Sequence, residues 1–291
     1  MRLRVATFAS IVAIASMVAR QANSVRPSPP TQPPNDESPQ QLVRDMVWNE
    51  IQGQKNDHTL WRYHELQEDN GGPRRLLDVI HTRDGQIYRV LAINGQTLTG
   101  KELEIEDNRI QKLLSDHRRI QENQKKRQQD ENQEITMMNV LPDAFIFREE
   151  GQEGSSVKLA FTPNPNFHPT THADEVFHHM VGTLLIDRDA KRLVEIDGRL
   201  TTKVKFGGGL LGHLDEGGTF HVDDRNVGAG HWDIVLLDVD MNGKVLFFKT
   251  ISVRQNEKYF DYHQVPDNIT LEQAAQLLQK GAAGSPSLSG H

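Results

Sequence analysis

Apolar and polar residues alternate with a period of two along most of this chain, a pattern typical of β-strands. The alternation predicts strands over residues 58–68, 75–82 and 86–93, and a longer series after residue 142. That series comprises 143–149, 155–163, 175–188, 190–205, 217–226, 230–241, 244–255 and 257–265. Short turns such as Asp84-Gly85 and Asn242-Gly243 separate the strands, so we expect successive strands to be antiparallel neighbours.

Three segments change to a helical period. Ser38 can cap a helix over 38–53, with Pro39 at its first position. An insertion over 101–138 is also expected to be helical, and its first 34 residues hold 8 basic and 9 acidic side chains. Its part from Gln121 to Gln133 lacks an apolar stripe, which predicts a solvated helix held by ion pairs one turn apart, or a partly frayed one. A last helix is expected over 270–280.

Several strands are apolar on both faces, as in 230–241, where Trp232 and Ile234 alternate with Val235 and Leu237. Both faces of such a sheet must be kept from water. The sequence therefore predicts an α+β protein, mainly antiparallel β, whose sheet of about eleven strands forms an unclosed half-barrel. Helices would cover one face, and the curvature of the sheet or a ligand would cover the other.

The composition narrows the function classes. The 291 residues are 36% hydrophobic and 25% charged, as in a soluble globular protein with polar segments. There is no cysteine, which excludes disulfides, thiolate metal sites and cysteine nucleophiles. The formal net charge of -7 argues against a nucleic-acid partner. Acidic residues on both sides of the basic run 125–127 neutralise it.

The two ends of the chain differ from its body. Residues 1–24 combine Arg2 and Arg4, a short apolar run and small residues before an Ala-x-Ser site, which predicts a secretory signal peptide and an exported, periplasmic protein. An uncleaved, membrane-associated anchor is the alternative. The proline-rich segment 25–37 is a predicted linker, 38–280 a single half-barrel domain, and 281–291 a disordered tail.

A glycine run, Phe206 to Gly212, contains a formal Gly-x-Gly-x-x-Gly. A phosphate-binding loop of this kind requires a helix directly after it, in a parallel βαβ unit. The residues that follow, 213–218, instead indicate a turn into another strand. We interpret the run as a bend in the sheet, or as an apolar loop through Leu210 and Leu211 at the mouth of the half-barrel.

Four histidines, His168, His172, His178 and His179, lie within twelve residues and could suggest a zinc or copper site. In the predicted strand 175–188, however, His178 and His179 would point to opposite faces. A surface loop is the preferred interpretation, and no metal or cofactor is predicted. Motifs of serine hydrolases, zinc proteases and P-loop proteins are missing, so we predict a protein that is not an enzyme.

The segment 182–194, Gly-Thr-Leu-Leu-Ile-Asp-Arg-Asp-Ala-Lys-Arg-Leu-Val, resembles a strand–turn–strand of the lipoprotein-carrier superfamily, which includes LolA, LolB, LppX and RseB. Leu185 stands where those proteins usually have an aromatic residue. Residues 161–165, Phe-Thr-Pro-Asn-Pro, are similar to exported proteins of the same architecture. The order of signal peptide, amphipathic helix, three strands, helical insertion and long meander also resembles this superfamily, over roughly residues 40–265.

The resemblance implies an unclosed barrel with an apolar pocket on its concave face, which is the expected ligand site. Its candidate lining residues are Trp61, Tyr63, Phe145, Phe147, Phe161, Leu185, Leu210, Leu211, Phe220, Trp232 and Phe247. Core packing beneath the helices is the alternative for each of them. The expected function is to shield an acyl chain or a lipidated protein.

Two other functions stay open at this point. The protein could be an RseB-like envelope sensor or interaction module, in which the charged helix binds an envelope protein and side chains fill the pocket. It could also be a periplasmic hydrolase whose site the sequence does not reveal. The carboxylates are numerous enough for an acid–base pair, but none stands out.

Overall fold

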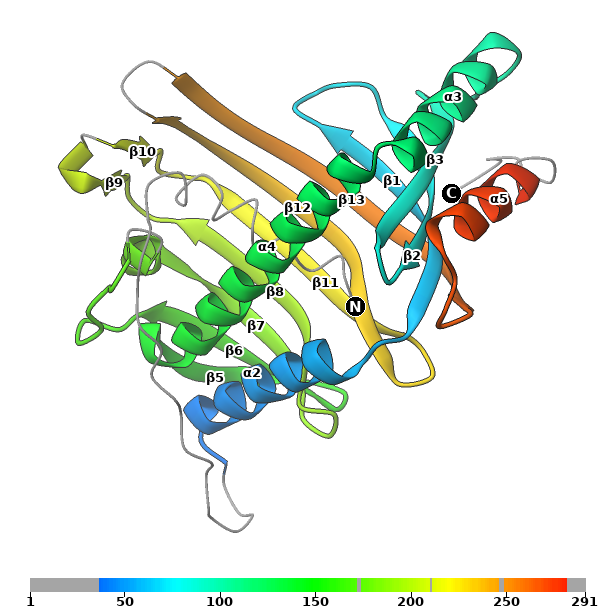
Figure 1. Ribbon diagram of the computed structural model, residues 1–291. Helices are drawn as coiled ribbons and strands as arrows, with labels where there is room; N and C mark the ends of the chain where they lie inside the picture. The colour runs from blue at the N-terminus through cyan, green and yellow to red at the C-terminus, as the bar shows by residue number, and fades with distance from the viewer. Residues whose placement is uncertain (1–36, 172–173, 210, 246–248, 282–291) are drawn as a thin grey trace.

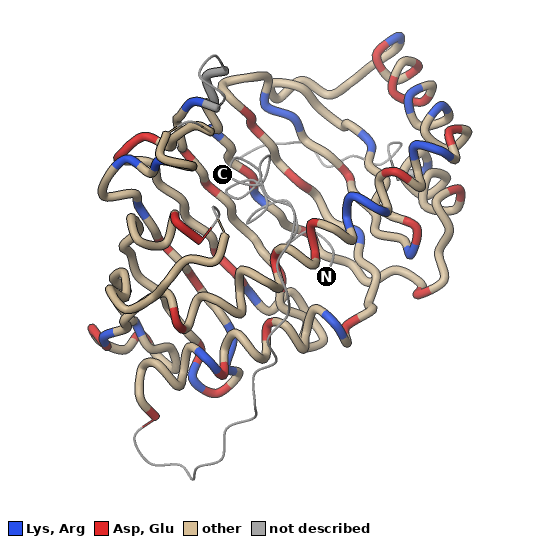
Figure 2. The backbone as a smooth tube through the Cα atoms, turned by 60° about the vertical axis from the view of Figure 1, so that its left-hand side comes forward, with Lys and Arg blue, Asp and Glu red and all other residues tan. Residues whose placement is uncertain are grey.

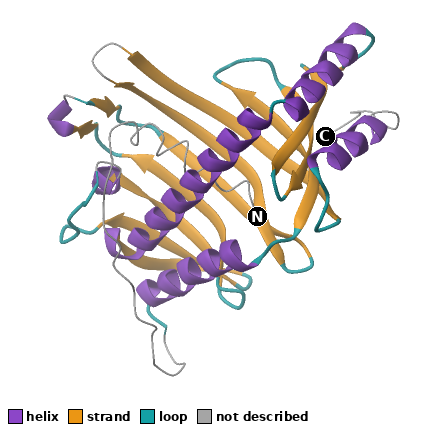
Figure 3. Ribbon diagram, viewed as in Figure 1, coloured by secondary structure: helices purple, strands orange, loops and turns teal. Residues whose placement is uncertain are grey.

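The structure is a computed structural model that describes residues 37–171, 174–209, 211–245 and 249–281. The predicted signal peptide, the predicted linker up to residue 36 and the predicted tail from residue 282 lie outside the described residues. Within the described part, a single large antiparallel sheet carries the fold, and helices pack on it (Figure 1 and Figure 3).

The sheet has thirteen strands, eleven of them in the order β4-β3-β2-β1-β13-β12-β11-β8-β7-β6-β5. The other two, β9 and β10, lie beside this path, where β10 pairs with both β12 and β9. The described strands at its two ends, β4 and β5, are not partners, so the sheet is unclosed, and the predicted fold class is confirmed. The strands are β1 (Leu60–Asp69), β2 (Arg75–Thr82), β3 (Gly85–Ile93), β4 (Gln96–Thr97), β5 (Phe145–Glu153), β6 (Ser156–Pro163), β7 (Met180–Asp187), β8 (Arg192–Leu200), β9 (Val204–Phe206), β10 (Gly212–Leu214), β11 (Thr219–Gly228), β12 (His231–Val245) and β13 (Lys249–Val265).

Most neighbouring strands follow one another in the sequence, as expected of a meander. The short strands β9 and β10 account for two exceptions, because β8 pairs with β11 and β10 pairs with β12. The third exception is β1, which pairs with β13 from Leu60↔Val265 to Asp69↔Gln255. This pairing adds the first three strands to the free side of the last one. A bulge between Arg62 and His64 interrupts the register, and Asp261 opposite it has a φ of 57°.

Two glycines let aromatic rings lie directly on the sheet. Phe161, Gly182, Gly198 and Phe220 form one row of register partners across β6, β7, β8 and β11. A Cβ at residue 182 would lie 1.8 Å from the carbonyl oxygen of Asp197 and 2.6 Å from the Phe161 ring. A Cβ at residue 198 would lie 2.1 Å from the Phe220 ring. The glycines are therefore required by close packing of the two rings.

Two helices cover the concave face. Helix α2 (Pro39–Asn56) begins after Ser38, whose Oγ accepts a hydrogen bond from Gln41 N at 3.2 Å, and it buries one apolar face. Helix α4 (His117–Ala144) crosses the same face diagonally (Figure 1). Among its described residues, apolar contacts with the main core lie in its last ten residues, including Met137 and Met138.

The expected helical insertion is two helices rather than one, α3 (Lys101–Ser115) and α4. The break falls at Asp116, whose Oδ1 accepts a hydrogen bond from Arg119 N at 3.0 Å and so caps α4. The insertion also runs to Ala144 rather than 138, because its last turns pack Met138 and Ala144 into the core.

The charged stretch of this insertion is solvated, as predicted. Figure 2 shows both signs of charge along the helical insertion. Ion pairs one turn apart join Arg118 to Glu122 at 2.9 Å and Arg127 to Glu131 at 3.6 Å. Each pair contributes a few tenths of a kcal/mol, about 0.2–0.5.

Helix α3 covers the side of the sheet next to β3. Glu106 Oε1 accepts a hydrogen bond from Val90 N at 2.8 Å, and Arg109 Nη2 donates to Tyr88 O at 2.7 Å. Side chains of α3 thus form hydrogen bonds with backbone groups of β3 that would otherwise be free to pair with a strand of another chain.

The convex face of β1 to β3 has a second, smaller core. Helix α5 (Leu271–Gly281) packs on β2 and β3. Its Leu278 joins Ile80 and Ile87, while the neighbours Val79 and Tyr88 belong to the concave side. Strand alternation thus explains why these strands are apolar on both faces, since a helix covers each of them.

Three local predictions were wrong. Asn242 and Gly243 lie inside β12, which runs on to Val245, and form no turn. From Lys249 onward, the predicted strands 244–255 and 257–265 are one strand, β13. A Cβ at residue 243 would lie 2.2 Å from the carbonyl oxygen of His213, so this glycine allows β10 to approach. The first part of the predicted strand 175–188 is a 3-10 helix, Asp174–His179.

The row of rings and glycines leads to a testable prediction. Gly182→Ala places a methyl group against Phe161 and the backbone, so it should lower the free energy of unfolding by about 1–3 kcal/mol or more. Gly151→Ala in β5 is the matched control, because nothing lies within 4 Å of its Cβ position. Urea unfolding of both variants measures the difference, and equal stabilities would refute the packing role of Gly182.

Candidate functional site

The candidate lining residues fall into several groups. Six of them are packed in the main core with at most 9% of their surface exposed: Trp61, Tyr63, Phe145, Phe147, Phe161 and Phe220. Leu211 is partly buried against the same core. Leu210 and Phe247 lie outside the described residues.

Leu185 does not lie with the other candidates. Its neighbours Leu184 and Ile186 belong to the concave-side core, and Leu185 pairs with Lys158 and Glu195 across the sheet. Alternation along β7 therefore places Leu185 on the convex face. The resemblance of segment 182–194 to a family pattern did not indicate on which face of the sheet Leu185 would lie.

The phenylalanines form one aromatic cluster at the β5 end of the sheet. The ring of Phe145 has its centroid 4.8 Å from that of Phe161, 5.4 Å from that of Phe177 and 6.3 Å from that of Phe147. All three contacts are edge-to-face, the arrangement that aromatic quadrupoles favour. These rings pack as core beneath α2 and the end of α4.

Trp61 and Tyr63 belong to a different, more polar part of the concave face. Trp61 stacks on His231 at 4.9 Å, and Tyr63 stacks on Tyr262 at 5.1 Å. The Tyr63 hydroxyl is also 3.2 Å from Nε2 of His81. Burial raises the pKa of Tyr63 well above its usual value, so this phenol stays protonated.

Next to these rings, β1 and β13 bring two carboxylic acids together. Glu65 is 6% exposed and Glu257 3%. Glu257 accepts hydrogen bonds from Tyr259, from Gln67 at 3.3 Å and from Gln255 at 2.6 Å. We call these five residues the acid cluster.

Burial raises the pKa of Glu65 to about 8, and the charge of Glu257 adds to the effect, while Arg75 partly opposes it. Glu65 therefore keeps its proton at neutral pH. The sequence contained one usable signal for this residue, since Glu65 alternates in phase with Trp61 and Tyr63, but the pairing of β1 with β13 could not be read from it.

Above the concave face, α4 is joined to the turn between β2 and β3 near its start and to α2 near its end. Near its start, Gln124 Nε2 donates to Asp84 O at 3.0 Å, in the turn between β2 and β3. Near its end, Arg44 of α2 pairs with Asp143 at 2.6 Å. Between these points, residues 121–134 contain no apolar side chain.

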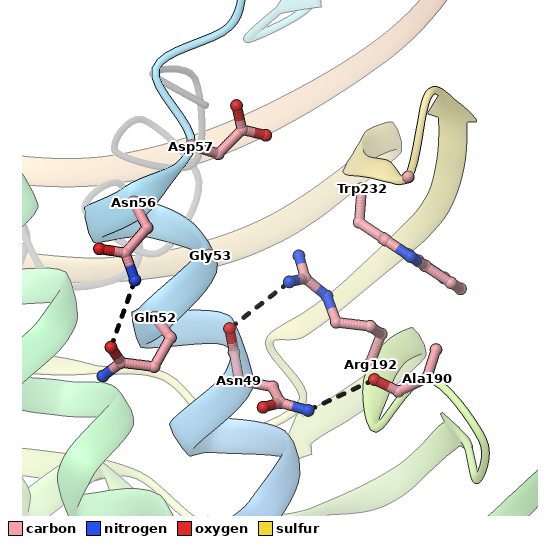
Figure 4. A pocket seen from close by; sticks show the side chains of 9 residues that line it. Asn49, Gln52, Gly53, Asn56, Asp57, Ala190, Arg192 and Trp232 are labelled. Atoms are coloured by element: carbon pink, nitrogen blue, oxygen red, sulfur yellow. Dashed lines mark hydrogen bonds between the residues drawn. The ribbon is translucent and has the colours of Figure 1, made fainter.

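A separate polar pocket of about 540 Å³ lies beside the last turns of α2 (Figure 4). We call it the α2 pocket. It is bounded by α2, by the turn between β7 and β8 and by the turn between β11 and β12. Its lining residues are Asn49, Gln52, Gly53, Asn56, Asp57, Ala190, Arg192, Gly230 and Trp232. Trp232 is thus the only predicted candidate among them.

One ion pair and one hydrogen bond hold two walls of the α2 pocket together. Arg192 Nη2 lies 3.0 Å from Oε2 of Glu50, and both side chains are largely buried. Glu50 Oε1 also accepts a hydrogen bond from Leu193 N at 3.0 Å. A Cβ at residue 53 would lie 2.6 Å from Arg192 Nη1, so Gly53 leaves room for the guanidinium.

Asp57 follows α2 directly and hydrogen-bonds to His231 and to Thr59 N. Burial alone would raise the pKa of Asp57, but the hydrogen bonds from His231 and Thr59 outweigh it and lower the pKa to about 2. The carboxylate is therefore ionised at neutral pH, and these partners bind it in place.

His178, His179 and the glycines of the run singled out in the sequence are apart from both places, and His172 lies outside the described residues. His178 and His179 lie in the 3-10 helix before β7, where His178 contacts Phe167 and His179 Nδ1 is 2.6 Å from Thr202 Oγ1. Among the described residues, no group of three or more His, Asp or Glu is arranged to hold a metal ion. Residues 207–209 form a short turn between β9 and β10, in agreement with the interpretation as a bend.

Comparisons with family models, with curated proteins and with solved structures gave no match. None of the helices in the described ranges is both long enough and apolar enough to span a membrane.

The raised pKa of Glu65 predicts a pH dependence of stability. The pKa of the Glu65 carboxyl group is 4.5 in the unfolded chain and about 8 in the folded protein. The folded state thus holds more protons between these values, and stability should fall as the pH rises through this window, by up to about 1.4 kcal/mol per pH unit.

Glu65→Gln should remove this decline, so the variant should be more stable than the wild type at pH 8 and similar to it near pH 5. Urea midpoints at both pH values provide the measurement. Glu68→Gln changes an exposed residue of the same strand and serves as the control. If the stability of Glu65→Gln falls with rising pH as steeply as that of the wild type, the prediction is contradicted.

Proposed function

We propose that this protein is an exported binding protein, not an enzyme, that shields an acyl chain or a lipidated partner on the concave face of its sheet, with α4 acting as a displaceable strap. The observation that carries the proposal is the composition of α4 where it crosses that face. Residues 121–134 contain no apolar side chain, so lifting this part exposes no apolar surface of the helix itself.

The sheet offers an apolar floor beside the acid cluster. Val222, Leu237 and Val239 lie on the concave side of β11 and β12, and each is at most 3% exposed. An acyl chain gains about 0.8 kcal/mol for each CH₂ group that such a surface buries. The floor is thus suited to a ligand whose affinity comes from apolar burial.

The hydrogen bonds that Gln124 and Arg127 of α4 would have to break are weak, while Ile120 before them stays packed on the second core. Gln124 is bonded to Asp84, and Arg127 Nη2 lies 3.5 Å from Arg83 O, both at exposed positions. Each such hydrogen bond contributes about 0.5–1.5 kcal/mol at most. The break at Asp116 supplies a point at which α4 can turn relative to α3.

The export part of the proposal rests on the pattern of residues 1–24, which lie outside the described residues. N-terminal sequencing of protein from the native cell envelope tests it. A chain that begins after Ser24 is expected, and an intact Met1 would point to an anchored protein instead.

An interaction module is the second candidate, and two observations favour it. Six candidate lining side chains are packed in the core. In addition, Ile105 on α3 is 68% exposed among charged neighbours, where a partner protein could cover it. In this case the charged helices, and not the concave face, would carry the function.

A tethering experiment tests the strap directly, because a chain without cysteine can be labelled specifically at introduced ones. Gln124→Cys with Asp84→Cys, joined by a short bifunctional maleimide, fixes the start of α4 to the sheet. We expect this link to weaken binding of a fluorescent fatty acid at least tenfold, while the unlinked double variant binds like the wild type.

Arg44→Cys with Asp143→Cys is the matched control, because this link fixes the packed end of α4, which need not move. Linked control protein should bind normally. Equal effects of the two links would refute the strap. If the wild type carries no lipid after extraction and binds no fatty acid, the acyl-binding proposal fails and the interaction module takes its place.

A further inference from the structure

The α2 pocket is a second place where a ligand can bind, separate from the concave face and independent of the proposed function. Its volume of about 540 Å³ is within the range of about 300–1,000 Å³ that small-molecule sites occupy. Three segments far apart in the sequence form its walls: the end of α2, the turn before β8 and the start of β12.

Carboxamide side chains dominate the hydrogen-bonding groups of the lining. Asn49 Nδ2 donates to Ala190 O, and Asn56 Nδ2 donates to Gln52 Oε1, both at a long 3.4 Å. Gln52 Nε2 and Asn56 Oδ1 have no hydrogen-bond partner among the described residues. The pocket therefore offers a donor and an acceptor side by side, which is what a hydroxyl group requires.

The charged residues of the lining are already compensated. Arg192 is paired with Glu50, and its Nη1 donates to Asn49 O at 3.4 Å. Asp57 is bound by His231 and Thr59. An anionic or cationic ligand would have to compete with these internal partners, so the charges favour a neutral one.

Trp232 provides an apolar surface in this polar setting. Its side chain bounds the pocket opposite the end of α2, with Arg192 between them (Figure 4). The guanidinium carbon of Arg192 lies 6.0 Å from the centre of the indole ring. A half-buried indole can pack against the C–H face of a ring while its surroundings bind polar substituents.

We propose that the α2 pocket binds a neutral saccharide, whose ring packs on Trp232 and whose hydroxyl groups bond to Asn49, Gln52 and Asn56. The rest of the lining supports this choice. Ala190 contributes the only aliphatic side chain of the lining residues, so an acyl chain would find little to bury there. The pocket at the end of α2 thus differs in ligand chemistry from the concave face that the helix covers.

The test uses the full chain and four neutral disaccharides as probes: maltose, cellobiose, trehalose and N,N′-diacetylchitobiose. Calorimetric titration should detect at least one of them at millimolar concentration or below. Choline chloride and inorganic phosphate, as a cation and an anion, should not displace it. Absence of binding by all four disaccharides, or displacement by either ion, would overturn the proposal.

Variants place the binding in the pocket. Trp232→Ala should weaken binding at least tenfold. Asn56→Ala, at an exposed position that the fold does not depend on, should weaken it at least threefold. Trp48→Phe is the matched control, since Trp48 lies on α2 outside the lining, is 61% exposed and should not affect binding.

If Asn56→Ala binds the disaccharide as tightly as the wild type, the site lies elsewhere and the inference is wrong, even if Trp232→Ala proves unstable. Binding of the fluorescent fatty acid should be the same in Asn56→Ala and in the wild type. The two proposals can therefore fail separately.

Discussion

Strand β1 is hydrogen-bonded to β13 along its length, and this contact joins segments from opposite ends of the folded chain. Without it, the first three strands and the meander would be separate sheets, and the concave face would stop at β13. The same pairing sets Gln67 opposite Glu257 and Glu65 opposite Tyr259. Both the extent of the concave face and the acid cluster within it therefore depend on this one register.

Placing two acids on that face costs stability. A core of aliphatic residues would hold the sheet more firmly, and burial leaves Glu65 protonated near neutral pH. The polar side chains sit on the same face as the apolar floor of β11 and β12. A face of mixed polarity tolerates water better than a purely apolar one when a helix above it moves, which is compatible with a strap that opens.

The order of elements could be predicted from the sequence because local signals specify it. Strand β2 has the expected bounds, and the expected hairpin follows it, although its two turn residues are Arg83 and Asp84 and Gly85 already belongs to β3. The wrong predictions concern residues whose local structure depends on tertiary contacts. Gly243 serves the approach of β10 and not a turn, and Asp116 caps a second helix. The α2 pocket was not predictable, because its walls come from three distant segments, and only the aromatic character of Trp232 gave a signal.

Helix α2 contributes to both candidate sites, and it does so with two different faces. Its apolar residues, among them Leu42, Met46 and Ile51, pack on the concave-side core, while Asn49, Gln52 and Asn56 line the pocket. The buried pair of Glu50 and Arg192 fixes this helix to β8, and breaking such a pair from one side costs about 3–5 kcal/mol. The hydrogen bonds of Gln124 and Arg127 in α4 are exposed and of far smaller net value. In the proposed movement of α4 at Gln124 and Arg127, the pair of Glu50 and Arg192 would keep α2 in place, and the polar pocket would keep its shape whether the concave face is open or closed.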